Sequence, residues 1–150
     1  MELTEQTVLN CLFSDEEYVR KTLPFIEREY FQSESNKVVF DMMQYHIEKY
    51  NTVPTRDSLL ISLDELNVGE NIYSESKNII ELIDNVKDDH RNSLWQLDVT
   101  EKWCQDRALY NAVMKSIGIL NDDAPNKGEL PKILQEALAV SFDSNIGHDF

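Results

Sequence analysis

The longest uninterrupted helical pattern of the chain runs from Ser93 to Asn121 and contains no proline. At 100° per residue its large apolar side chains fall on one broad stripe, and smaller apolar side chains fall roughly opposite. The broad stripe predicts the main packing face, and the second set leaves this helix with apolar surface on two sides. The stripe comprises Trp95, Val99, Trp103, Leu109, Tyr110, Val113, Met114, Ile117 and Leu120, and the opposite set comprises Leu97, Cys104, Ala108, Ala112 and Ile119.

The length of this helix favours association as its role. At ~1.5 Å rise per residue it forms a rod of roughly 43 Å, whereas a globule of this chain length has a diameter of roughly 38 Å. Part of the rod should therefore reach beyond the globule, although Gly118 costs about 1 kcal/mol in a helix interior and favours an end one turn earlier. Asp106 lies on the apolar stripe, four residues after Lys102, and we expect this pair to fix the register of an interface.

Five shorter helices are predicted before the long one, with an irregular segment at Pro24 whose apolar side chains join the core. The second helix begins with a capping box at Ser14, and the turn at residues 67–69 favours positive φ after the fourth. The predicted helices span residues 3–12, 14–22, 35 or 36 to 50, 55–66 and 74–86, and the irregular core cluster is Phe25, Ile26, Tyr30 and Phe31.

A helical hairpin is predicted at the C-terminal end. Residues 122–129 contain both proline and glycine and predict a charged turn. Pro131 suits the first position of a last helix that ends near Phe142. The chain is therefore all-α, with a helical globular part at 1–92, a hairpin at 93–142 and the start of a linker at 143–150.

Composition and charge restrict the function. The chain has 150 residues, 41% hydrophobic and 28% charged, with a formal net charge of −14. This length suits one domain, and the negative charge argues against direct binding to a phosphate backbone, which needs lysine and arginine. Membrane-spanning and signal segments are not predicted, and Cys11 and Cys104 are expected to be buried thiols. We expect a cytoplasmic protein.

The sequence contains no recognisable catalytic or metal-binding motif. Neither a GxxxxGK[ST] loop, nor HExxH, nor EF-hand spacing is present. His46 lies on the inner face of its predicted helix, and the pair His148 and Asp149 has no nucleophile in a recognisable pattern. The sequence predicts no catalytic residue, cofactor site or metal site in this chain.

The C-terminal residues closely resemble a known family. The segment 137–150 is similar to the end of the N-terminal domain of T4-type phage replicative DNA helicases, members of the DnaB-like hexameric helicases. Other short stretches resemble that family at corresponding places, strongly in the last two helices and thinly elsewhere. These stretches are 29–31, Tyr50 with Val53 and Pro54, 100–102 with Gln105, 107–108, and 111–112.

This resemblance implies a ring hexamer in which helical N-terminal domains form a collar that also meets primase and the helicase loader. ATP and Mg²⁺ binding and contact with single-stranded DNA would belong to a separate C-terminal domain, because this chain lacks the nucleotide-binding loop. In that reading the natural protein continues past Phe150, functions in the host cell cytoplasm, and uses the present chain for assembly and not for catalysis.

We therefore predict an assembly domain that self-associates through its hairpin. The alternative is an acidic DNA mimic or another protein-binding inhibitor, which needs carboxylates spaced like phosphates on one face. In this sequence the carboxylates are scattered through helix caps and exposed positions. The predicted interface residues are Ala108, Leu109, Ala112, Val113, Ile117, Leu120, Leu134 and Leu138.

Overall fold

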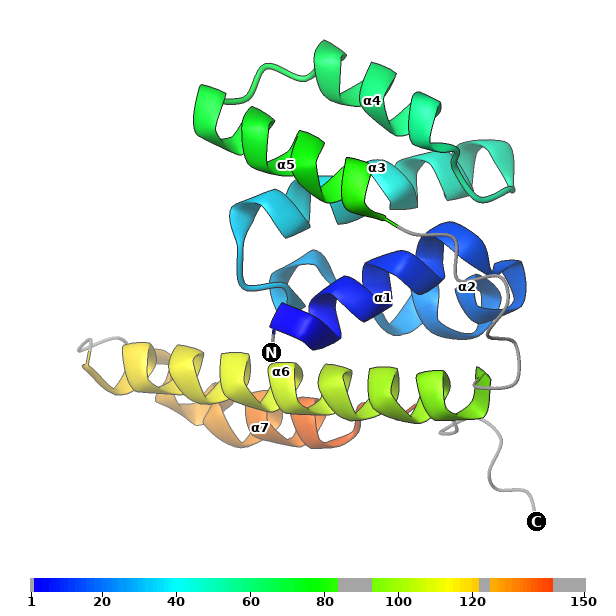
Figure 1. Cartoon of the computed structure of the whole chain (residues 1–150). Helices are drawn as coiled ribbons and strands as arrows, with labels where there is room; N and C mark the ends of the chain where they lie inside the picture. The colour runs from blue at the N-terminus through cyan, green and yellow to red at the C-terminus, as the bar shows by residue number, and fades with distance from the viewer. Residues whose placement is uncertain (1, 84–92, 122–124, 142–150) are drawn as a thin grey trace.

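The computed structural model describes residues 2–83, 93–121 and 125–141, and this part of the chain is all-α with no strand. This confirms the predicted fold class. Figure 1 shows the order of the helices along the chain. The α-helices are α1 (Glu2–Ser14), α2 (Glu16–Thr22), α3 (Glu34–Tyr50), α4 (Arg56–Glu65), α5 (Glu70–Leu82), α6 (Ser93–Asn121) and α7 (Leu130–Leu138), and the 3-10 turns are η1 (Leu23–Phe25), η2 (Arg28–Tyr30) and η4 (Pro125–Glu129).

The helices lie in two groups on either side of a central pair (Figure 1). α1 and α2 occupy the middle, and α3, α4 and α5 cover one side of them. On the other side α6 crosses the whole molecule and packs on α1, α2 and η2, while α7 folds back along α6. The end of α6 that precedes η4 lies beyond the central helices, as its length predicted.

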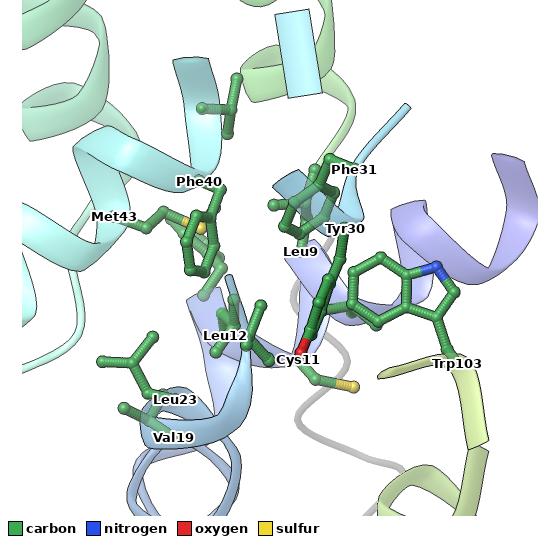
Figure 2. Close-up of a cluster of buried hydrophobic side chains, with 14 of the residues drawn as sticks. Leu9, Cys11, Leu12, Val19, Leu23, Tyr30, Phe31, Phe40, Met43 and Trp103 are labelled. Carbon is green, nitrogen blue, oxygen red and sulfur yellow. The ribbon is translucent and has the colours of Figure 1, made fainter. Parts of the chain in front are cut away.

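Aromatic side chains of η2, of the residue after it and of α3 form a cluster with Trp103 of α6 (Figure 2). The Phe31 ring lies 5.1 Å from the Phe40 ring of α3 and 4.9 Å from the Trp103 ring of α6, measured between centroids. Tyr30 meets Trp103 edge to face at 6.0 Å. The irregular segment after Pro24 thus belongs to the core, as predicted, with Ile26, Tyr30 and Phe31 buried and Phe25 partly buried.

Polar side chains cap the starts of α2, α3 and α4, and two of these caps differ from the predicted residues. Thr55 caps α4 through a reciprocal capping box with Ser58, as the sequence predicts for this helix start. The prediction at Ser14 was wrong, because its hydroxyl donates to the Asn10 carbonyl inside α1 and Asp15 caps α2 instead. Ser33 caps α3, two residues before the predicted position. Each error concerns a neighbouring polar residue able to cap equally well.

The fifth helix begins earlier than predicted. α5 starts at Glu70 with Gly69 as its N-cap, because Gly69 has φ −63 and does not take the left-handed conformation expected of it. Among the described residues other than glycine, Asn51 alone has positive φ, where it ends α3. The guanidinium of Arg56 in α4 donates to the carbonyls of Ile80 and Ile83 at the end of α5, which joins the two helices.

The long helix has the predicted bounds, but its buried face is the opposite of the predicted one. The smaller apolar side chains opposite the broad stripe are buried or partly buried. Of the residues in the broad stripe, only Trp103 is buried. Three of the buried positions, Cys104, Ala108 and Ala112, carry short side chains. Short side chains let neighbouring helices approach α6 closely, so the side with smaller residues became the inner side.

Gly118 does not end α6, which continues to Asn121. A Cβ atom built on Gly118 has no heavy atom within 4 Å outside the neighbouring helical backbone, and the residue is exposed. We expect Gly118→Ala to raise the free energy of unfolding by roughly 0.5–1 kcal/mol, because alanine loses less backbone entropy on folding. Urea denaturation of both proteins measures the change, and a loss of stability contradicts the helical environment described here.

The hairpin is present as predicted in its described part. α7 packs on α6 more extensively than on any other described element, and its first turn contains Pro131. The helix ends at Leu138, earlier than the predicted Phe142, which lies outside the described residues. Residues 122–124 of the predicted turn and the predicted linker at 143–150 also lie outside them.

Candidate functional site

One side of α6 carries a row of large apolar side chains that no other described element covers. We call this surface the α6 stripe, and it runs nearly the full length of the helix. Its ends are well exposed, at 59% for Trp95 and 56% for Leu120. The α6 stripe consists of Trp95, Leu109, Tyr110, Val113, Met114, Ile117 and Leu120.

Contacts with the central helices fix the rotation of α6 about its axis. The Tyr18 hydroxyl of α2 lies 2.6 Å from the Thr100 hydroxyl, and Arg107 donates from Nε to the Tyr30 carbonyl at 2.7 Å. One turn further on, Asn111 donates from Nδ2 to the Glu29 carbonyl at 3.0 Å. Thr100, Arg107 and Asn111 therefore mark the side of α6 that faces α2 and η2.

A second side of α6 faces α7. Gln105 donates from Nε2 to the Val140 carbonyl at 3.0 Å, just beyond the end of α7, and the Ser141 hydroxyl donates to Glu101 at 3.1 Å. Ala112 lies two turns after Gln105 on the same side of the helix. With α2 and η2 on one side and α7 on another, the α6 stripe is the side left to solvent.

The predicted interface residues divide into two groups. Leu109, Val113, Ile117 and Leu120 belong to the α6 stripe, and Leu138 of α7 is also exposed. Ala108 and Ala112 are buried inside the chain, and Leu134 is partly buried against the core. These three residues support the hairpin from within and offer little surface to another molecule.

Trp95, Tyr110 and Met114 are exposed, although the helical periodicity of the sequence predicted them on the packing face. Trp103 is buried as predicted, whereas Trp95 is not the core anchor that its position suggested. The missed signal was size, because the opposite side of the helix carries the short side chains that close helix packing favours.

Lys102 and Asp106 interrupt the α6 stripe with a pair of opposite charges. The Lys102 ammonium lies 3.7 Å from the Asp106 carboxylate, one turn away, and both side chains are exposed. An exposed pair at this spacing contributes little to the stability of a single chain. The pair lies between Trp95 and Leu109 along the helix.

The buried titratable groups are suited to packing. Burial raises the pKa of the Cys11 and Cys104 thiols to about 12, so neither forms a reactive thiolate near neutral pH. Burial also raises the pKa of the Tyr18 hydroxyl well above its usual value. Within the described residues, no group of three or more histidine, cysteine, aspartate or glutamate side chains is arranged to hold a metal ion.

None of the described helices is both long enough and apolar enough to cross a membrane. The fold and the α6 stripe together define a helical domain with one large apolar helix face open to solvent. Such a face is typical of proteins that associate with another molecule.

The chain is similar in sequence to a known replication protein. The chain is 33% identical, over 155 aligned positions, to a DnaB-like replicative helicase of Enterobacteria phage T4. The alignment includes 97% of this chain but 32% of the relative, so the chain spans about a third of that protein's length. This similarity, which lies in the N-terminal part of the helicase, confirms the resemblance identified from the sequence. No protein-family model matches the chain.

Proposed function

We propose that this chain is the N-terminal assembly domain of a phage replicative DNA helicase and that it associates with copies of itself through the α6 stripe. The observation that carries the proposal is the uncovered row of apolar side chains on α6. The similarity to a DnaB-like replicative helicase supports a second copy as the occupant, because the family resemblance implies a ring of identical subunits.

The chemistry of the α6 stripe suits helix-to-helix packing. From Leu109 to Leu120 its apolar residues recur at helical spacing, which gives a seam of about three turns for the α6 of a neighbouring subunit, and Trp95 adds a separate contact near the start of the helix. Aromatic side chains such as Trp95 and Tyr110 are enriched at the centres of protein interfaces. Lys102 and Asp106 would fix the register of the two helices, since misaligned pairing leaves charges against apolar side chains.

Self-association is tested by sedimentation equilibrium over a range of protein concentrations. We expect the wild-type chain to form dimers or larger oligomers, and Val113→Glu to weaken the association by at least about tenfold, because each subunit would bury an unpaired carboxylate. Ser74→Glu is the matched control, since it adds the same charge at an exposed position of α5. A wild-type chain that stays monomeric at high concentration, or equal association of the two variants, contradicts the proposal.

In the whole protein this domain would dock primase and the helicase loader, while a separate C-terminal domain would bind ATP and Mg²⁺ and move along single-stranded DNA. The net charge of −14 supports leaving DNA to another domain. Sequencing the gene downstream of the codon for Phe150 tests this arrangement. A following GxxxxGK[ST] segment supports it, and a stop codon at that point overturns it.

A further inference from the structure

A polar pocket of about 530 Å³ is lined by residues of α1, of the start of α3 with the two residues before it, and of α5. Its volume is within the range of pockets that bind ligands. Among the described residues that line it, Glu5 and Glu75 are the charged ones, and no lysine, arginine or histidine is present. The described part of the lining is therefore negative.

Both carboxylates are held in place by neighbouring groups. Glu5 is 1% exposed, and its two oxygens accept hydrogen bonds from the Gln32 backbone N–H at 3.0 Å and from Asn36 Nδ2 at 2.7 Å. The Ser35 hydroxyl donates to Glu75 at 2.6 Å. These donors are neutral, so they orient the carboxylates without adding a positive charge, and for Glu5, which is buried, a charge without a partner of opposite sign is costly. A bound cation would remove that cost.

The rest of the lining specifies what kind of cation fits. Asn10 also lines the pocket, and its buried side-chain oxygen has no hydrogen-bond donor among the described residues. A guanidinium group suits several acceptors at once, because it is planar and offers five N–H donors. Ile79 and Leu82 of α5 add exposed or partly exposed apolar surface to the pocket wall, which a hydrophilic cation alone would not cover.

We propose that this pocket binds an arginine side chain of a partner protein, with an apolar neighbour of that arginine packed against Ile79 and Leu82. The net charge of −14 favours the approach of a basic segment. The inference deepens the docking part of the proposed function and rests on it only for the partner being a protein. Because binding is measured on the isolated chain, it can fail while self-association through the α6 stripe stands.

The test uses a blocked leucine–arginine–leucine peptide and the same peptide with citrulline, which has nearly the same shape without the charge. Isothermal titration of the full chain should give an affinity at least about tenfold higher for the arginine peptide, the usual scale for a hydrogen-bonded ion pair. Equal affinities, or no binding at millimolar peptide, overturn the proposal. Arginine amide alone should bind more weakly than the peptide, and equally tight binding assigns the pocket to a small molecule instead.

A pair of variants on the same helix locates the binding. Glu75 is exposed on one side, so Glu75→Gln should fold normally and lose about tenfold in affinity for the arginine peptide. Glu81→Gln removes the same charge from α5 outside the pocket lining and should bind like the wild type. Equal effects of the two variants mean that net charge and not the pocket attracts the peptide, which overturns the assignment.

Discussion

Phe31→Ala is expected to lower the free energy of unfolding by about 3–5 kcal/mol, the range for removing a large aromatic ring from a core. Phe31 is almost fully buried, and its ring contacts both Phe40 of α3 and Trp103 of α6. Because its neighbours come from two different groups of helices, the cavity cannot close by a small shift of one helix. Guanidinium denaturation, followed by circular dichroism, measures the change.

Tyr45→Ala is the control for this substitution. Tyr45 is also aromatic and lies on α3, but it is 62% exposed. Its removal should change the free energy of unfolding by no more than about 0.5 kcal/mol, as is usual for surface positions. Similar losses for the two variants contradict the placement of Phe31 at the centre of the core.

The helix pattern was predictable because it depends on local sequence. α6 has the bounds that its periodicity indicated, since 29 residues without proline give a strong helical signal. The start of α5 was missed by four residues, because Gly69 can either end one helix or begin the next. A single residue's conformational freedom does not distinguish these two uses, whereas packing of α5 on α3 and α4 does.

The orientation of α6 was not predictable from hydrophobicity alone. A large apolar face indicates burial, but it does not say whether the covering surface belongs to the same chain. Here the same chain covers the side with small residues, and Arg107 and Asn111 hold it there through backbone carbonyls of η2. These contacts join residues far apart in sequence, so no local pattern contains them.

The candidate site was therefore predicted only in part. Of the residues predicted for the interface, Val113 and Ile117 lie on the exposed side of α6, whereas Ala108 and Ala112 face inward. The polar pocket was not predicted, because Glu5 and Glu75 lie on helices distant in the sequence and meet only through the fold. The similarity to a helicase supplied the biological setting, and the structure supplied which surface is open.

Neighbouring residues on α6 give the sharpest test of its orientation. Ala112 is 7% exposed and Val113 is 41% exposed. A change to glutamate should therefore mainly lower the stability of the monomer at Ala112 and mainly weaken self-association at Val113. Ala112→Glu places a carboxylate between α6 and α7 and should lower the free energy of unfolding by about 3 kcal/mol or more. Val113→Glu should cost the monomer less than about 1 kcal/mol but weaken self-association. Urea denaturation at low protein concentration separates the two effects, because oligomers otherwise add to the measured stability. If Val113→Glu destabilises the monomer more than Ala112→Glu does, the broad stripe faces inward after all and the proposed interface loses its basis.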